Sequence, residues 1–271
     1  MGESETELTG SPSLVSVIVP AYNEEDNISP CVAQLSEAMQ RAGHKAEIIV
    51  VNDGSTDNTL SVARSLRAKC PSLRVIDLKR NFGKATALKE GIRASKGHTV
   101  AFFDADMQYD ATDLVKLVAL VSNGTDVANG QRNYNGYGQT RTAFSKIYNA
   151  ILRVVFTLDV TDSNCGMKVL NRKAADPDIL FRYGLPLVLP FLKVRGFRLY
   201  EAPVSMRIRR AGESKYFKNG SFLGGWRNLR DISYHTGLLL GLLTSLPLLR
   251  PERRSSAKNQ TLTLQTRSSR V

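Results

Sequence analysis

Short apolar runs rich in β-branched residues alternate with amphipathic stretches along the first half of the chain. Four runs predict buried strands, at 15–19, 47–51, 73–78 and 99–103. The stretches between them repeat apolar side chains at helical spacing, at 28–39, 57–69 and 84–94. Strand and helix in alternation favour right-handed crossovers. The sequence therefore predicts an α/β fold, with a Rossmann-like, mainly parallel sheet flanked by helices.

Polar clusters follow three of the predicted strands. They occupy residues 20–26, 52–57 and 104–108. In an open parallel sheet, ligands bind beyond the carboxyl ends of the strands, so we expect these clusters to form one site. Helix capping would explain single acceptors such as Asp26 or Asp57. It does not explain carboxylates that gather at one edge of one sheet.

The cluster after the fourth strand has the spacing of a metal site. Asp104, Asp106 and Gln108 offer two or three hard oxygen ligands, which suit Mg²⁺ or Mn²⁺ when diphosphate oxygens and water complete the shell. Neither a G-x-G-x-x-G fingerprint nor a G-x-x-x-x-G-K-[ST] loop occurs in the sequence. This argues against a classical dinucleotide enzyme and a P-loop NTPase.

Composition and charge narrow the class of protein further. With 42% hydrophobic and 23% charged residues, the 271-residue chain has ordinary globular composition. The net charge is +12, and residues 205–271 contribute 13 Lys and Arg against 3 Asp and Glu. A basic C-terminal part predicts an anionic partner or a solvated basic tail. Because aromatic and basic residues do not interleave there, we expect no nucleic-acid partner.

The cysteines and the N-terminus bear on the compartment. Cys31, Cys70 and Cys165 are odd in number and form no C-x-x-C pair, which favours a reducing compartment. Residues 1–14 are acidic and lack an apolar core, so we expect no secretory signal. Catalysis is therefore expected to face the cytosol.

Seven motifs, in order and within about residues 14–231, resemble the inverting family 2 glycosyltransferases of the GT-A fold. Within that family they are similar to the polyprenyl-phosphate sugar synthases, such as the dolichol-phosphate mannosyltransferases and undecaprenyl-phosphate glycosyltransferases. The motifs are VIVPAYNEE (17–25), VVNDGSTDNT (50–59), RNFGKATALKEGI (80–92), FFDADMQ (102–108), GQR (130–132), DSNCGMKVLNRKAA (162–175) and RRAGESKY (209–216).

The resemblance implies roles for individual residues. A nucleotide-sugar site would comprise Pro20, Tyr22, Glu24, Asp53, Lys84, Asp104, Ala105, Asp106, Arg209 and Lys215. The metal ligands would be Asp104, Asp106 and Gln108. The acceptor phosphate would lie against Arg132, Arg141 and Ser145, and the catalytic residues would be Asp106, Arg141 and Arg209. The alternative for Arg209 is a solvated basic turn.

Two positions depart from the signature of these relatives. Asn164 stands where many carry Gln, and Met167 replaces an aromatic residue. The preference for sugar and acceptor is therefore left open.

Two apolar segments bear on membrane contact. One is a stripe on a predicted helix, which either packs in the core or faces a membrane: Phe144, Ile147, Tyr148, Ile151, Val154, Val155 and Leu158. The other, 232–249, is uncharged and would reach roughly 27 Å as a helix, a marginal span. With its arginine-rich flanks, an in-plane segment is the alternative. We expect a disordered N-terminus (1–13), a GT-A domain (14–231), a membrane-associated segment (232–254) and a disordered basic tail (255–271).

The predicted function follows from the motifs together. We expect metal-dependent, inverting transfer of a sugar from a GDP- or UDP-linked donor onto a polyprenyl phosphate, at the cytosolic membrane surface. The alternative within the family is a saccharide acceptor in cell-surface polysaccharide synthesis. A more remote alternative is a basic nucleic-acid-binding protein.

Overall fold

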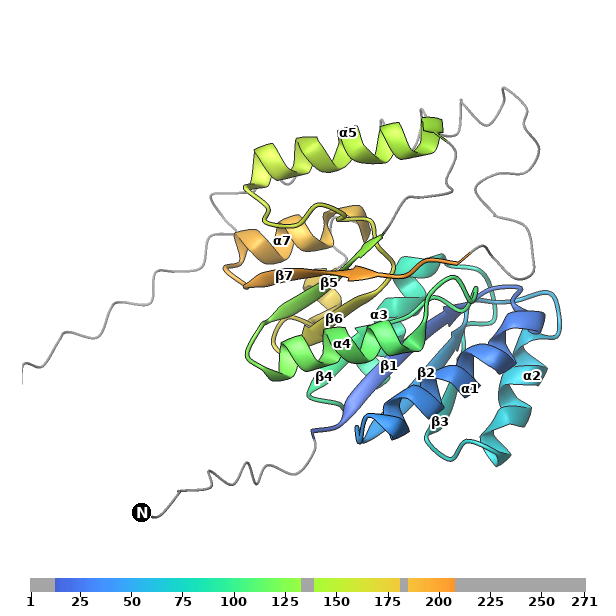
Figure 1. The fold of residues 1–271 in the computed structure, drawn as a ribbon. Coiled ribbons are helices and arrows are strands. Elements are labelled where there is room, and N and C mark those ends of the chain that lie inside the picture. The colour runs from blue at the N-terminus through green and yellow to red at the C-terminus, as the bar shows by residue number, and fades with distance from the viewer. Residues whose placement is uncertain (1–12, 133–138, 181–184, 208–271) are drawn as a thin grey trace, which may run out of the picture.

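The computed structural model describes residues 13–132, 139–180 and 185–207, in which seven strands form one sheet with the order β3-β2-β1-β4-β6-β5-β7 (Figure 1). The strands are β1 (Val15–Ala21), β2 (Ala46–Asn52), β3 (Leu73–Asp77), β4 (Thr99–Phe102), β5 (Val127–Arg132), β6 (Lys168–Asn171) and β7 (Leu199–Val204). The α-helices are α1 (Glu25–Arg41), α2 (Thr59–Ser65), α3 (Lys84–Ala94), α4 (Ala111–Ser122), α5 (Gln139–Phe156), α6 (Pro177–Leu180) and α7 (Val188–Val194). Short 3₁₀ helices cover Leu66–Ala68 and Leu185–Leu187.

The sheet confirms the predicted α/β class and its mainly parallel pairing. Strand β1 pairs in parallel with β2 and β4, and β2 pairs in parallel with β3. Strand β6 is antiparallel to both β4 and β5, and Lys168, its first residue, lies opposite Phe102 at the carboxyl end of β4. The chain that precedes β6 therefore arrives at the edge where the metal motif lies.

Two apolar cores fill the two faces of the sheet. Along β1, Val17 and Val19 face one core and Ile18 faces the other, as the alternation of side chains along a strand requires. The first core includes residues of α1, α2 and α4, and the second includes residues of α3, α5 and α7. Both faces are covered, which explains why the central strands are continuous apolar runs.

The helix predicted over 57–69 is wrong at both ends, because α2 ends at Ser65 and a 3₁₀ turn follows it. Helix α2 begins at Thr59, because Asp57 lies outside the helix and its Oδ1 accepts a hydrogen bond from the Thr59 backbone N–H at 3.0 Å. Local side-chain bonds of this kind end the extended loop and orient the first turn.

The apolar stripe on α5 does not form a single face. Leu152 and Phe156, which the stripe omitted, are buried in the second core, and Leu158 is buried beyond the end of the helix. Four stripe residues are exposed: Ile147 (59%), Ile151 (45%), Val154 (82%) and Val155 (38%). Figure 1 shows α5 above α7, on the outside of the molecule. The side chain of Phe144 lies outside the described residues.

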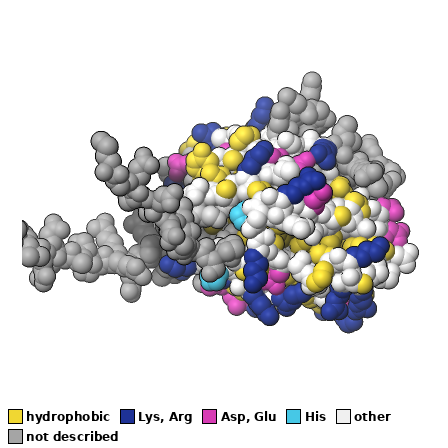
Figure 2. Space-filling view, turned by 60° about the horizontal axis from the view of Figure 1, so that its bottom comes forward, with side chains coloured by type: hydrophobic (Ala, Val, Ile, Leu, Met, Phe, Trp, Pro, Cys, Tyr) yellow, Lys and Arg dark blue, Asp and Glu magenta, His cyan; other side chains and the backbone are white. Residues whose placement is uncertain are grey.

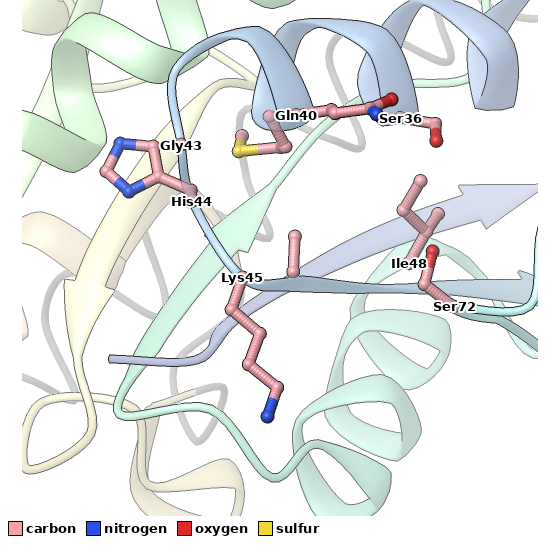
Figure 3. Close-up of a pocket in the computed structure, with 9 residues that line it drawn as sticks. Ser36, Gln40, Gly43, His44, Lys45, Ile48 and Ser72 are labelled. Atoms are coloured by element: carbon pink, nitrogen blue, oxygen red, sulfur yellow. The ribbon is translucent and has the colours of Figure 1, made fainter. Parts of the chain in front are cut away.

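A pocket of 470 Å³ lies at the amino ends of the strands, between the end of α1 and the start of β2 (Figure 3). Its lining includes Gln40, His44, Lys45 and Ser72. The polar clusters of the sequence follow the opposite, carboxyl ends, so this pocket is separate from them.

The remaining expectations about membrane and charge fall largely outside the described residues. The segments 232–254 and 255–271 lie there, as do residues 1–12. In the part of the chain that is described, no helix is both long enough and apolar enough to cross a bilayer. Figure 2 shows one face on which Lys and Arg side chains are interspersed with Asp and Glu.

Candidate active site

Four loops meet at the carboxyl edge of the sheet and are joined to one another by polar contacts. The β1–α1 loop bonds the β2–α2 loop, since the Asn23 backbone N–H donates to Ser55 Oγ at 3.0 Å. The β2–α2 loop bonds the β3–α3 loop through Asp53. Lys84, which directly follows the β3–α3 loop, pairs with Asp104 of the β4–α4 loop. The structure thus brings the three predicted polar clusters together.

The first loop carries Pro20, Tyr22 and Glu24. Pro20 and Tyr22 are half-buried where β1 ends. Glu24 is buried: its backbone N–H donates to Thr59 Oγ1 at 2.7 Å, and its Oε2 accepts from Asn27 Nδ2 at 2.7 Å. These bonds hold Glu24 at the junction of α1 and α2. Its contact with a nucleotide stays a prediction.

Asp53 holds the backbone of the next loop. It is buried, and its Oδ1 and Oδ2 accept the backbone N–H groups of Phe82 at 2.8 Å and Gly83 at 2.9 Å. The two loops touch so closely that a Cβ on Gly54, whose φ is +66°, would lie 2.2 Å from the carbonyl carbon of Arg80. The family resemblance implies that Asp53 belongs to the nucleotide-sugar site. The structure adds that its carboxylate orders the turn before α3.

Lys84 is the first residue of α3 and reaches the metal motif. It follows Gly83, whose φ of +92° is accessible mainly to glycine. The Lys84 Nζ lies 2.5 Å from Asp104 Oδ1, and both side chains are partly exposed, at 35% and 22%. An ammonium therefore sits on the carboxylate that was predicted to bind the metal.

The metal motif has a constrained backbone and a negative environment. Met107 has a φ of +60°, an uncommon value for a residue other than glycine, and the Gln108 backbone N–H donates to Asp106 Oδ1 at 3.2 Å. Ala105, which separates Asp104 from Asp106 in the sequence, is buried. Burial raises the pKa of the nearby Cys31 thiol, and the negative charges of Asp106, Asp104 and Glu24 raise it further.

Gly166 forms a close backing for Asp104. A Cβ at Gly166 would lie 2.3 Å from Asp104 Oδ2, so a larger residue at this position would force the carboxylate to move. The Gly166 backbone N–H also donates to the phenol oxygen of buried Tyr109 at 3.3 Å. A carboxylate packed against backbone, with Asp106 and Gln108 beside it in the loop, fits a divalent cation that prefers oxygen ligands.

Protein side chains would not be the only ligands of a metal ion at this site. Among the described residues, no group of three or more His, Cys, Asp and Glu side chains is placed to hold a metal ion. Two carboxylates and an amide match the pattern of Mg²⁺ and Mn²⁺ sites that share substrate phosphates.

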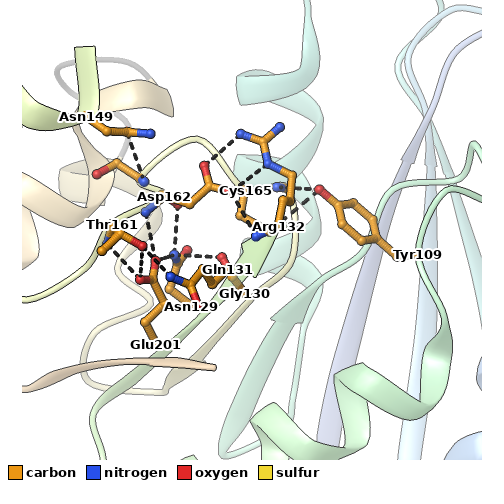
Figure 4. A network of polar contacts seen from close by, with 12 residues as sticks. Tyr109, Asn129, Gly130, Gln131, Arg132, Asn149, Thr161, Asp162, Cys165 and Glu201 are labelled. Atoms are coloured by element: carbon orange, nitrogen blue, oxygen red, sulfur yellow. Dashed lines mark hydrogen bonds and ion pairs between the residues drawn. The ribbon is translucent and has the colours of Figure 1, made fainter. Parts of the chain in front are cut away.

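A buried polar network lies beside the metal motif (Figure 4). Arg132, at the end of β5, binds Asp162 in a fork, with Nε to Oδ2 and Nη2 to Oδ1 both at 2.7 Å. Glu201 of β7 accepts the Asp162 backbone N–H at 2.8 Å, and Asn129 donates to the Asp162 carbonyl at 2.9 Å. Burial lowers the pKa of the Arg132 guanidinium, but the hydrogen bonds and charge of Asp162 raise it more. Arg132 is therefore a fixed cation, and its binding of an acceptor phosphate stays a prediction.

Lys168 is a buried cation that sequence reasoning did not assign to the site. Its Nζ donates to the Cys165 carbonyl, and burial lowers its pKa to about 8. Tyr109, Asp162 and Gly166 were likewise not assigned. The signal that could have found three of the four is the motif at 162–175, which contains Asp162, Gly166 and Lys168.

The described chain ends beside the metal motif. The Arg207 backbone N–H donates to the Gln108 carbonyl at 2.8 Å, and its guanidinium binds Asp110. Arg209 and Lys215 lie outside the described residues, and so do the side chains of Arg141 and Ser145, whose backbone belongs to α5. Their predicted roles remain predictions.

Comparison with protein families gives one match that covers more than half of the chain. The model described as "Glycosyl transferase family 2" matches residues 16–177. This range contains the four loops, the metal motif and Gly166.

Two curated relatives extend the similarity. The chain is 29% identical over 238 residues to the undecaprenyl-phosphate 4-deoxy-4-formamido-L-arabinose transferase of Edwardsiella ictaluri, covering 86% of this chain and 69% of the relative. It is 30% identical over 209 residues to the dolichol-phosphate mannosyltransferase of Pyrococcus furiosus, covering 74% and 58%. The chain spans between 47% and 58% of the length of three of the curated relatives that it matches.

Solved structures show the same fold. The glucosyl-3-phosphoglycerate synthase from Mycobacterium tuberculosis, in complex with Mn²⁺ and UDP-glucose, matches with a TM-score of 0.59 and 19% identity, covering 89% of this chain and 81% of that one. At this identity the likeness concerns the fold alone.

Proposed function

Because the chain belongs to glycosyl transferase family 2, we propose that it transfers a sugar from a nucleotide-diphosphate donor onto a polyprenyl phosphate. The proposal of a nucleotide-diphosphate donor rests on the carboxyl edge of the sheet. There Asp104 lies between Gly166 and Lys84, and Asp106 is close by in the same loop. The acceptor half is supported by the relatives, two of which are named for undecaprenyl-phosphate and dolichol-phosphate.

The donor site is proposed around the four joined loops. Asp104, Asp106 and Gln108 would hold Mg²⁺ or Mn²⁺, which when bound neutralises the departing nucleotide diphosphate. Pro20, Tyr22, Glu24 and Asp53 would surround the nucleotide. The nucleotide would be UDP or GDP. Arg209 and Lys215, which belong to the motif at 209–216, would bind the donor phosphates.

The acceptor phosphate needs little general-base help, because it is already ionised near neutral pH. Its oxygen would attack the anomeric carbon in line with the departing diphosphate, in a single displacement that inverts that centre. Arg132 is held in place by Asp162. Arg141 and Ser145 lie four residues apart in α5, a spacing that puts both on one helix face. These three would bind the acceptor phosphate, so that alignment and charge neutralisation carry the catalysis.

We also propose that α5 contacts the cytosolic face of a membrane. The exposed Ile147, Ile151 and Val154 recur at helical spacing, and Lys146 and Arg153 are exposed on the same helix. The sequence of α5 contains no Asp or Glu. An apolar band beside basic residues suits an anionic bilayer surface. The segment 232–254 would add to this attachment.

Sedimentation with anionic liposomes tests the membrane contact. Val154→Glu should reduce binding, because it removes an apolar side chain and puts a carboxylate into the apolar band. Ala150→Glu makes the same charge change at another exposed position of α5. Because alanine contributes only a methyl group to the band, this variant should reduce liposome binding less than Val154→Glu. Equal binding by the wild type and both variants would contradict a role for this band.

Transfer itself is tested with a panel of radiolabelled UDP- and GDP-sugars, each incubated with polyprenyl phosphates and Mn²⁺. Label in the chloroform phase with one donor supports the proposal. Label that appears only on saccharides or on small water-soluble acceptors would instead favour the alternative function within the family.

A further inference from the structure

Lys84 forms an ion pair with the first carboxylate of the metal motif. Its Nζ lies 2.5 Å from Asp104 Oδ1, a close ion pair in a partly exposed setting. The other carboxylate oxygen, Oδ2, is the one packed against Gly166. Asp104 thus pairs with the Lys84 ammonium through Oδ1, while Oδ2 lies against Gly166.

The position of Lys84 is imposed by the fold. The two oxygens of Asp53 bind the backbone N–H groups of Phe82 and Gly83, which immediately precede Lys84. Helix α3 then packs in the second core through its buried apolar side chains, Ala87, Leu88 and Ile92. The side chain of Lys84 thus starts from an anchored backbone and reaches across from the start of α3 to the β4–α4 loop.

An ammonium and a divalent cation cannot share one carboxylate oxygen without strong repulsion, because like charges a few ångströms apart raise each other's energy. Lys84 neutralises Asp104 and so lowers the density of negative charge that would otherwise attract the ion. A donor diphosphate brings new negative oxygens to which the ammonium can move.

We infer that Lys84 is a placeholder cation: it holds Asp104 until the metal is loaded, releases Oδ1 to the ion, and passes to the donor diphosphate. Lys84 is thus a positioning residue that couples metal loading to donor binding. The inference rests on the proposed function for the identity of the donor, but its first consequence concerns the metal alone.

The test measures Mn²⁺ binding to the full chain without donor, by the electron paramagnetic resonance signal of free Mn²⁺. Lys84→Met should bind Mn²⁺ about two- to fivefold more tightly than the wild type, the range expected when one partly exposed ion pair no longer competes. Lys84→Arg keeps the charge and should stay close to the wild type.

Lys89→Met is the matched control. Lys89 lies in the same helix with a similar exposed fraction, 32% against 35%, but its ion pair is with Asp178. Its Mn²⁺ affinity should equal that of the wild type. With Mn²⁺ present, Lys84→Met should also bind the nucleotide sugar more weakly, whereas Lys89→Met should not.

Equal or weaker Mn²⁺ binding by Lys84→Met, in a protein whose circular dichroism matches the wild type, would overturn the inference. So would the absence of Mn²⁺ binding in every variant. If the variants bind Mn²⁺ as expected but no polyprenyl phosphate accepts sugar, the placeholder role stands and the proposed acceptor fails.

Discussion

Replacing Gly166 with alanine tests the placement of the metal site most directly. The new Cβ would lie 2.3 Å from Asp104 Oδ2 and 3.0 Å from its Cγ. Gly166 does not have a positive φ, so alanine meets no backbone strain and the contact with Asp104 decides the outcome. To restore an ordinary contact distance the carboxylate must move by roughly 1 Å.

A shift of this size is large for a metal ligand, because metal–oxygen distances tolerate changes of only about 0.2 Å. We therefore expect Mn²⁺ affinity to fall by about 10- to 100-fold, the range seen when groups that orient metal ligands are changed. The free energy of unfolding should fall by about 1–3 kcal/mol, as for other overpacked sites. Calorimetric titration with Mn²⁺ and urea denaturation measure the two effects.

Gly97→Ala is the control for a general packing defect. The added Cβ would lie 2.6 Å from the Leu14 carbonyl oxygen. Gly97 precedes β4, so this contact lies at the opposite edge of the sheet from the metal motif. This variant should lose stability while its folded form keeps wild-type Mn²⁺ affinity. A stable Gly166→Ala protein that binds Mn²⁺ and nucleotide sugar like the wild type would refute the assignment of Asp104 as a metal ligand backed by Gly166.

Three further predictions concern ligands, acceptor and pH. Asp104→Asn and Asp106→Asn should each abolish transfer in a folded protein, and EDTA should do the same reversibly, because each change removes a charged ligand or the ion itself. Arg141→Ala should weaken use of the polyprenyl phosphate by roughly 1.5–3 kcal/mol with little change in donor affinity, as kinetics against each substrate would show. Burial lowers the pKa of Lys168 to about 8, below the unfolded value of roughly 10.4, so the unfolded chain binds more protons between these pH values. The wild-type free energy of unfolding, relative to that of Lys168→Met, should therefore rise from pH 8 to 10 in urea titrations.

Each of these expectations has a result that contradicts it. Full turnover by metal-stripped enzyme in EDTA would remove the metal from the reaction. Loss of donor binding in Arg141→Ala with normal saturation by lipid phosphate would move Arg141 to the donor side. An unfolding free energy that follows the same pH course in the wild type and in Lys168→Met would show that Lys168 titrates alike in the folded and unfolded states.

The sequence determined four of the seven described strands, the helices between them and the edge of the sheet at which chemistry is expected. It did not predict β5, β6 or β7. The helix at 84–94 has the predicted bounds, and the four predicted strands are present within two residues at each end. Apolar periodicity reports which face of an element is buried, and that information is local. The polar clusters needed only one more rule, that the carboxyl ends of parallel strands share an edge.

Only the tertiary structure decided which side chains touch. Asp104 lies against Lys84 on one side and Gly166 on the other, and Arg132 lies against Asp162, although each of these pairs is separated by at least 20 residues in sequence. The sequence named most of these residues without their contacts. Distances of 2–3 Å between distant segments depend on how the helices and the antiparallel β6 pack, which no local pattern encodes.

Helix α5 also shows the difference between what the sequence predicts and what tertiary packing decides. Its helical periodicity was readable, but the stripe of apolar residues combined positions that the fold separates: Leu158 is buried, whereas Ile151 and Val154 are exposed. A helix with apolar residues around much of its circumference has more than one face that could be buried. Packing against α7 selects Leu152 and Phe156 for the second core. Four other apolar residues of α5 are left on the surface.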